Sequence, residues 1–236
     1  MRIDILTLFP EMFENVLGSS ILRIAREKGL VQYNLFNIRE YAENRRCVDD
    51  RPYGGGPGMV MKPEPVFNTI EAIESQTDVR PRRILLTPQG CRFTQSIAKE
   101  LSKEPSVMLI CGHYEGFDER IRTGLEAREI SIGDYVLSGG EIPAMVVIDS
   151  VVRLIPGVLG DSNSTVNECF NEDLLEYPQY TRPAEYRGMR VPDVLMSGNH
   201  QKIKEWQANH ALKRTMEQRP DLIMNKKKFS LGNIEK

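Results

Sequence analysis

Three short glycine-containing loops could bind a nucleoside through their main chain. They read TPQG at residues 87–90, CGHYEGFDER at 111–120 and SIGDYVLSGGE at 131–141, and each follows or adjoins an apolar stretch. Glycine lets the main chain approach a ligand closely, so that carbonyl and amide groups can contact an adenine or a ribose. The groups expected to do so belong to Gly112, Gly133, Gly139 and Gly140, between apolar walls from Tyr114, Ile132, Tyr135 and Leu137.

The usual phosphate-binding and metal-binding motifs are missing from the sequence. Neither GxGxxG after the first apolar stretch nor GxxxxGK[ST] occurs, so the glycine loops do not predict a dinucleotide or triphosphate site. GxSxG, HExxH and the kinase signatures are absent as well. The three histidines are far apart and the four cysteines lack CxxC pairs, so we assign no metal site and expect reduced thiols, mostly in the core.

The elements that must position these loops read as alternating strands and helices. Apolar, β-rich runs at 2–9, 31–38, 82–88, 106–112 and 128–133 are separated by helix-like segments. This alternation predicts an α/β domain with a mainly parallel sheet, and the near-continuous apolar strands indicate helices on both faces. In such sheets ligands collect beyond the carboxyl ends of the strands. We therefore expect the three loops to meet in one pocket.

Charge is unevenly distributed along the chain. The 236 residues are 40% hydrophobic and 27% charged, with a net charge of -2. Residues 182–236 hold 12 Lys and Arg against 6 Asp and Glu, whereas the preceding 181 residues hold 19 against 27. Clustered basic residues favour a polyanionic partner, or else form a solvated helix face. Residues 196–223 predict a helix with a basic outer face, begun by Asn199 or Ser197.

The segment before this basic part differs in composition. Residues 161–181 contain five acidic residues and no Lys or Arg, which indicates a flexible linker or lid. The sequence holds no run of 18 apolar residues, and its start lacks the pattern of a secretory signal. We therefore expect a cytoplasmic protein.

Seven ordered motifs together give the chain a family resemblance. They are LFPEMF (8–13), VDDRPYGGGPGM (48–59), CGHYEGFDER, SIGDYVLSGGE, IPGVLG (155–160), YTRP (180–183) and LMSGNH (195–200). The series resembles the bacterial tRNA (guanine-N1)-methyltransferase family, TrmD, over nearly the whole chain.

The resemblance implies an architecture that composition does not reveal. It implies the trefoil-knotted α/β fold of the SPOUT methyltransferases, with a small all-helical domain after it, working as a homodimer whose active site lies at the subunit interface. The expected parts are a knotted catalytic domain that binds S-adenosyl-L-methionine at 1–160, a flexible acidic linker or lid at 161–181, and a basic helical domain that binds tRNA at 182–236.

The methyl donor of this family is S-adenosyl-L-methionine, and the resemblance places its contacts in the three loops. The implied donor-binding residues are Leu86, Pro88, Gly112, Tyr114, Glu115, Ile132, Gly133, Asp134, Tyr135, Val136, Leu137, Gly139, Gly140 and Pro143. The loop expected to approach the target nucleotide contributes Asp49, Asp50, Arg51, Tyr53, Gly54, Gly55, Gly56, Pro57 and Gly58.

The implied reaction methylates N1 of guanine 37, beside the tRNA anticodon. Guanine N1 carries a proton that a base must remove, and negative charge then develops on O6. The family's arginine for O6 maps to Arg153. Its catalytic aspartate maps to Glu168, which keeps the carboxylate and adds one methylene. The other carboxylates of the lid, Glu172, Asp173 and Glu176, are the alternatives for the base. A magnesium ion is possible as a further cofactor, and no protein ligand is assigned to it.

Three other functions remain open from the sequence. A different knotted methyltransferase acting on another RNA base would share the donor loops but lack the combination of RPYGGGPGM and YTRP. A non-catalytic RNA-binding protein would have lost Arg153 and the lid carboxylate, and both are present. A small-molecule methyltransferase would not need the basic helical part.

Overall fold

The computed structural model describes residues 1–45, 47–160, 169–170 and 174–223. The chain divides into two compact units, Met1–Gly160 and Asp161–Lys236, which are treated separately below. Among the described residues, no helix combines the length and apolar character needed to cross a membrane.

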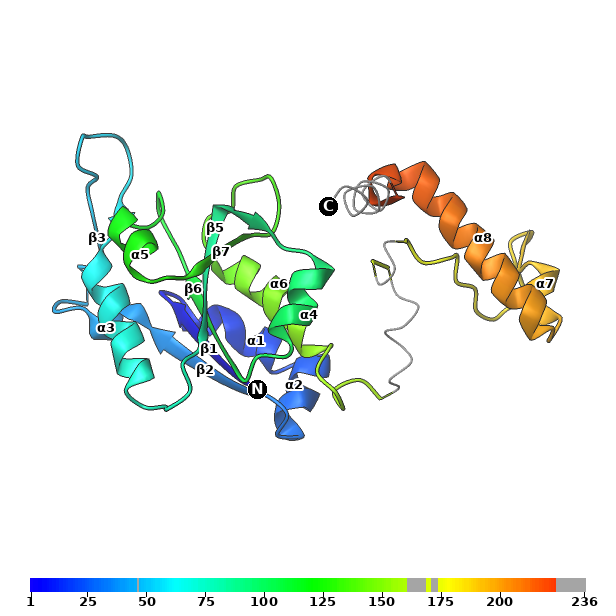
Figure 1. Ribbon diagram of the computed structural model, residues 1–236, viewed down its shortest axis with the longest axis horizontal. Coiled ribbons are helices and arrows are strands. Elements are labelled where there is room, and N and C mark those ends of the chain that lie inside the picture. The colour runs from blue at the N-terminus through cyan, green and yellow to red at the C-terminus, as the bar shows by residue number, and fades with distance from the viewer. Residues whose placement is uncertain (46, 161–168, 171–173, 224–236) are drawn as a thin grey trace, which may run out of the picture. The chain divides into compact units, whose positions relative to one another are not determined.

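The first unit is built on a five-stranded parallel sheet in the order β2-β1-β6-β5-β7 (Figure 1). Each strand begins in one of the five apolar runs, and only β5 extends beyond its run, from residue 88 to Arg92, so the predicted mainly parallel α/β sheet is confirmed. The side chains of β6 are all buried, as its position at the centre of the sheet requires. The bounds are β1 Arg2–Thr7, β2 Gln32–Asn37, β5 Arg82–Arg92, β6 Ser106–Cys111 and β7 Arg128–Ser131.

Helices cover both faces of this sheet (Figure 1). Alternate residues of a strand point to opposite faces, so Ile84 packs into one core and Leu85 into the other. Side-chain caps begin two of the helices: Thr94 accepts from the amide of Ile97, and Asp118 accepts from that of Arg120. One face holds α1 Glu14–Leu17, α2 Ser20–Glu27, α4 Gln95–Leu101 and α6 Glu141–Val152, and the other holds α3 Pro63–Glu74 and α5 Glu119–Gly124.

The remaining elements of this unit are short. The 3-10 helices η1 (Pro10–Phe13) and η2 (Ile38–Tyr41) follow β1 and β2. Strands β3 (Asp49–Asp50) and β4 (Val60–Met61) form an antiparallel hairpin. Its long connecting loop projects away from the sheet (Figure 1). The polar, glycine-rich stretch 48–59 is therefore the arm of a hairpin.

The second unit corrects one expectation. It contains α7 (Asp193–Met196) and α8 (His200–Gln218), but also a two-stranded ribbon of β8 (Glu185–Tyr186) and β9 (Met189–Arg190), so it is not all-helical. The ribbon forms because the two residues between its strands, Arg187 and Gly188, both have positive φ angles, as a tight hairpin turn requires.

The long helix α8 starts as predicted. The side chain of Asn199 accepts a hydrogen bond from the amide of Lys202, which confirms it as the cap. The described residues 174–181 run along this helix: the amide of Leu175 donates to Oγ1 of Thr215 over 2.9 Å, and Tyr180 lies beside Trp206. This part of the acidic segment is thus anchored to α8.

The cysteines also differ from expectation. All four thiols are free, but Cys111 alone among them is buried, while Cys47 and Cys91 are exposed. The expectation that most lie in the core was wrong: Cys47 lies in a connecting loop, and Cys91 lies in the last, exposed part of β5, after the detour from the sheet.

Candidate functional site

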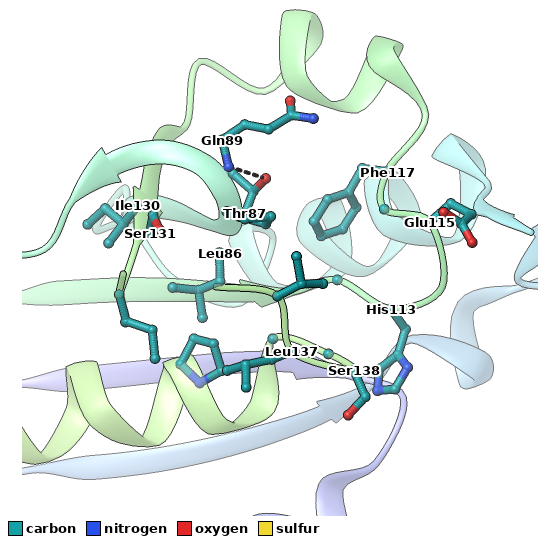
Figure 2. A pocket seen from close by; sticks show the side chains of 18 of the residues that line it. Leu86, Thr87, Gln89, His113, Glu115, Phe117, Ile130, Ser131, Leu137 and Ser138 are labelled. Atoms are coloured by element: carbon teal, nitrogen blue, oxygen red, sulfur yellow. Dashed lines mark hydrogen bonds between the residues drawn. The ribbon is translucent and has the colours of Figure 1, made fainter. Parts of the chain in front are cut away.

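A pocket of about 230 Å³ lies at the carboxyl ends of β5, β6 and β7 (Figure 2). It is lined by three segments, 86–89, 112–117 and 130–140, with Arg122 and Pro143 from two adjacent helices. Figure 2 shows Leu86, Phe117 and Leu137 around this space. The structure therefore brings together the three loops that were expected to converge.

Nearly all of the residues expected to contact the donor line this pocket. The exception is Asp134, whose side chain is 89% exposed and pairs with Arg92 over 2.9 Å. The lining members are Leu86, Pro88, Gly112, Tyr114, Glu115, Ile132, Gly133, Tyr135, Val136, Leu137, Gly139, Gly140 and Pro143. Sequence reasoning did not assign Thr87, Gln89, His113, Gly116, Phe117, Arg122, Ile130, Ser131 and Ser138 to it.

Most of the unassigned residues carry a signal that was available. Eight of the nine lie in the same three segments, within two positions of an assigned residue, so the whole of each segment could have been assigned. Arg122 lies on α5, and only the fold places it at the pocket.

Two of the loops approach each other through glycine. The amide of Gly140 donates to the carbonyl of Gly112 over 2.7 Å, and His113 forms a β-bridge with Gly139. A Cβ atom on Gly140 would lie 2.7 Å from Cα of Cys111 and 2.8 Å from the amide nitrogen of Gly112. Both contacts are to backbone, so a side chain at this position would push the two walls apart.

The third wall is a detour in β5. Leu86 and Cys91 both pair with Ile130 of β7, so the residues between them leave the sheet and return to it. Gln89, in this detour, accepts a hydrogen bond from Arg122. Arg122 is in turn fixed by a two-point ion pair with Glu129, whose shorter contact is 2.7 Å. The rim of the pocket is thus held by charged side chains.

A buried carboxylate lies behind the glycine contact. Glu141 is 1% exposed and accepts a hydrogen bond from Oγ1 of Thr7 over 2.7 Å. Its other oxygen lies 3.1 Å from Nε2 of His113. Burial, with a smaller effect of the Glu141 charge, raises the pKa of Cys111 well above its usual value. The Cys111 thiol is therefore protonated at neutral pH and is not a nucleophile.

The hairpin of β3 and β4 is joined to one wall of the pocket. The amide of Glu115 donates to the carbonyl of Met59, and the amide of Met61 donates to that of Gly116, each over 2.9 Å. The Tyr114 hydroxyl interacts with Asp49. Burial and this hydrogen bond raise the pKa of Tyr114, and Arg39 opposes the change.

The residues expected to contact the target nucleotide are on this hairpin. Asp49 and Asp50 form β3, and Tyr53 in the arm is fully exposed, with a relative accessibility of 102%. The arm residues are Arg51, Tyr53, Gly54, Gly55, Gly56, Pro57 and Gly58, and all of the glycines among them have positive φ angles.

Of the two expected catalytic residues, only Arg153 is described, and it does not line the pocket. Helix α6 begins at the pocket with Glu141, and Arg153 follows its last residue. Twelve helical residues at 1.5 Å each separate the two ends by about 18 Å. Glu168, and the alternatives Glu172 and Asp173, lie outside the described residues.

The histidines and acids of the described chain form no metal centre. No group of three or more His, Cys, Asp or Glu side chains among those residues is arranged to hold an ion. His113 contacts Glu141, whereas His210 stacks on Trp206 with a ring separation of 3.9 Å.

Comparison with known proteins shows the family of the chain. The family model described as tRNA (Guanine-1)-methyltransferase TrmD matches residues 1–225. A tRNA (guanine-N(1)-)-methyltransferase of Anoxybacillus flavithermus is 59% identical over 224 residues, covering 94% of this chain and 91% of the relative. The protein of that name from Bacillus subtilis is 58% identical over 224 residues, covering 94% and 92%. The chain therefore belongs to the tRNA (guanine-1)-methyltransferase TrmD family.

Proposed function

We propose that this chain transfers a methyl group from S-adenosyl-L-methionine to N1 of guanine 37 in tRNA. The observation that carries the proposal is the pocket at the carboxyl ends of β5, β6 and β7, built from glycine main chain and apolar side chains in a member of this family. The relatives' names specify the guanine N1 atom. Nucleotide 37, the donor and the residue roles are part of the proposal.

The pocket suits an adenosyl group better than a phosphate. Its lining supplies main-chain polar groups at Gly112, Gly133 and Gly139, and hydrophobic side chains at Leu86 and Leu137. Adenine and ribose need hydrogen bonds and apolar contact, and they carry no negative charge. When bound, the donor supplies an electrophilic methyl group that is attached to a sulfonium sulfur. After transfer of the methyl group, the rest of the donor leaves as a neutral thioether.

The chain must remove a proton and stabilise charge. Glu168 is the proposed base: its carboxylate takes the N1 proton as the methyl group bonds to N1. Arg153 is proposed to stabilise the negative charge that develops on O6. Compared with aspartate, the extra methylene of Glu168 moves the carboxylate by about a bond length, roughly 1.5 Å, so the backbone that carries it must lie correspondingly further from the guanine.

A homodimer completes the proposed site. Because Arg153 lies about 18 Å along α6 from the pocket of its own subunit, we assign it to the pocket of a second copy. An apolar surface supports this pairing: Met12 and Val16 are exposed near η1, and Ile142 and Val146 are exposed on α6, which packs beside η1. Burying these side chains between two copies would stabilise the dimer through the hydrophobic effect.

The remaining parts of the proposal concern topology and RNA. The trefoil knot of the family is consistent with the close passage of Gly140 over Cys111 and Gly112. Residues 161–181 are proposed as the lid that brings Glu168 to the guanine. The basic residues 182–236 are proposed to hold the anticodon stem, with Lys202 and Lys204 exposed on α8 for phosphate contacts.

The proposal is tested with a radiolabelled donor and two tRNA transcripts that carry G or A at position 37. We expect methylation of the G37 transcript alone. Equal methylation of both transcripts would refute the assigned target, and would favour a methyltransferase for another base. Absence of methylation from both would favour a non-catalytic RNA-binding protein.

The proposed base is tested by substitution. Glu168→Gln should nearly abolish methylation because it cannot take the proton, while donor binding stays intact, and Glu168→Asp should retain activity. Wild-type turnover in Glu168→Gln would exclude Glu168 as the base. If Glu176→Gln is inactive instead, the base is Glu176.

A further inference from the structure

His113 lies where the donor pocket meets the hairpin. Its backbone bridges to Gly139, on the donor side, and its amide donates to Sδ of Met61, in β4. Its ring lies 4.8 Å from that of Phe9. Figure 2 shows the side chain at the edge of the pocket beside Ser138. A displacement of His113 would therefore shift both the wall of the donor pocket and the hairpin of β3 and β4.

The imidazole of His113 is held by a buried charge. Its Nε2 lies 3.1 Å from Oε2 of Glu141, and Oε1 of Glu141 accepts from Thr7. A buried carboxylate is costly unless it is hydrogen-bonded or paired, and here the Thr7 hydroxyl supplies a hydrogen bond and the His113 ring a close polar contact. Glu141 is also in the first turn of α6, where the helix dipole favours negative charge. The carboxylate is a fixed anchor.

The anchor is in direct contact with the donor loop. A Cβ atom on Gly139 would lie 2.3 Å from Nε2 of His113 and 2.5 Å from Oε2 of Glu141. The imidazole and carboxylate therefore pack against the bare main chain of this pocket residue. On the other side, residues 115 and 116, two and three positions after His113, are hydrogen-bonded to Met59 and Met61 of the hairpin.

We propose that His113 and Glu141 form a positioning pair that sets the distance between the donor loop and the hairpin. The pair keeps the bound donor aligned with the guanine that the loop of the hairpin binds. Neither side chain reacts: His113 acts through Gly139 on one side and through residues 114–116 on the other. The inference rests on the proposed function, because it assigns the donor to the pocket beside Gly139.

The pair predicts a specific kinetic pattern. Losing it should weaken donor binding and slow the methyl transfer, since reacting groups that are misplaced by a fraction of an ångström react more slowly. It should change the KM for tRNA little, because most of the RNA contacts are assigned by the proposed function to the basic residues 182–236. If His113 had a merely structural role, its substitution would lower the melting temperature. It would not selectively change kcat and the KM for the methyl donor relative to the KM for tRNA.

The test compares His113→Gln with His113→Phe. Glutamine can place an N–H group near the position of Nε2. Phenylalanine keeps a flat ring of similar size but has no N–H group. We expect His113→Phe to lose about ten- to a hundred-fold in affinity for S-adenosyl-L-methionine, the range of one hydrogen bond to a charged group. His113→Gln should recover most of that loss. The control is His200→Phe, at an exposed position on α8, which should bind the donor as the wild type does.

The outcomes separate this inference from the proposed function. Calorimetric titration of the wild type with S-adenosyl-L-methionine comes first, and absence of binding there would overturn both. If the wild type binds and His113→Phe binds equally well, or if the Gln and Phe variants lose equal affinity, the positioning role is wrong and the donor pocket stands.

A double-mutant cycle tests the pair itself. Because Glu141 acts on the donor loop together with His113, adding His113→Phe to Glu141→Ala should cause no further loss of donor affinity. If the double variant instead loses donor affinity by the product of the two single-variant factors, the two residues act independently and the pairing is overturned.

Discussion

Replacing Gly140 by alanine tests the central geometry of the pocket. The added Cβ would meet Cα of Cys111 at 2.7 Å and the amide nitrogen of Gly112 at 2.8 Å. Both atoms belong to backbone that is continuous with the buried strand β6, so neither can rotate away. The substitution must therefore separate the two loops, and it weakens the 2.7 Å hydrogen bond from the Gly140 amide to the Gly112 carbonyl.

The size of the effect follows from these two losses. Overpacking in a close contact costs about 1–3 kcal/mol, and a lost main-chain hydrogen bond costs about 1 kcal/mol. Gly140→Ala should therefore destabilise the first unit by about 2–4 kcal/mol, which lowers its melting temperature by roughly 5–15 °C for a unit of this size. Because the separated loops are two walls of the pocket, donor affinity should fall about ten-fold or more.

The assays are thermal unfolding by circular dichroism and calorimetric titration with S-adenosyl-L-methionine. The matched control is Gly160→Ala, since a Cβ atom there meets nothing within 4 Å. The control should leave both quantities unchanged. If Gly140→Ala melts and binds like Gly160→Ala, the close packing of the two loops is refuted.

Two further predictions concern stability. Burial raises the pKa of Tyr33 to about 12, so its phenol stays neutral in the folded chain after it ionises in the unfolded chain near pH 10. This contribution to the stability of the folded chain is complete below pH 10 and is lost between pH 10 and about 12. In denaturant titrations over this range, the free energy of unfolding should fall less steeply with pH in Tyr33→Phe than in the wild type. An equal slope in the two proteins would contradict the burial effect. Asn199→Ala removes the cap of α8 and should cost about 1 kcal/mol, with faster amide exchange at Lys202; unchanged exchange there would exclude the cap.

The sheet was predictable because its strands are near-continuous apolar runs. A parallel strand buried on both faces needs hydrophobic side chains at almost every position, and in β6 all six residues are buried and all but Ser106 are hydrophobic. The pocket was predictable for a related reason: loops that follow parallel strands emerge at the same edge of the sheet.

The short ribbons could not be predicted from periodicity. Strands of two residues, such as β3 or β8, are too short to show alternation, and they depend on tight turns or on contact with other loops. The pair of His113 and Glu141 was missed for a different reason. The two residues are 28 positions apart, and Thr7 is more distant still, so only the order of strands in the sheet brings them together.

The detour in β5 places pocket-lining residues outside the paired part of the strand. Since Leu86 and Cys91 are both opposite Ile130, β5 returns after Gln89 and Gly90 to the same residue of β7 that it left, and the register of the pairing shifts across the detour. Residues could be inserted at or deleted from the turn without shifting Arg92 from its partner, Ser131. The detour is thus a place where loop length can be changed to alter selectivity for the bound nucleoside, on condition that Gly90 is kept, because a Cβ atom there would lie 2.4 Å from the backbone nitrogen of Ile130 in β7.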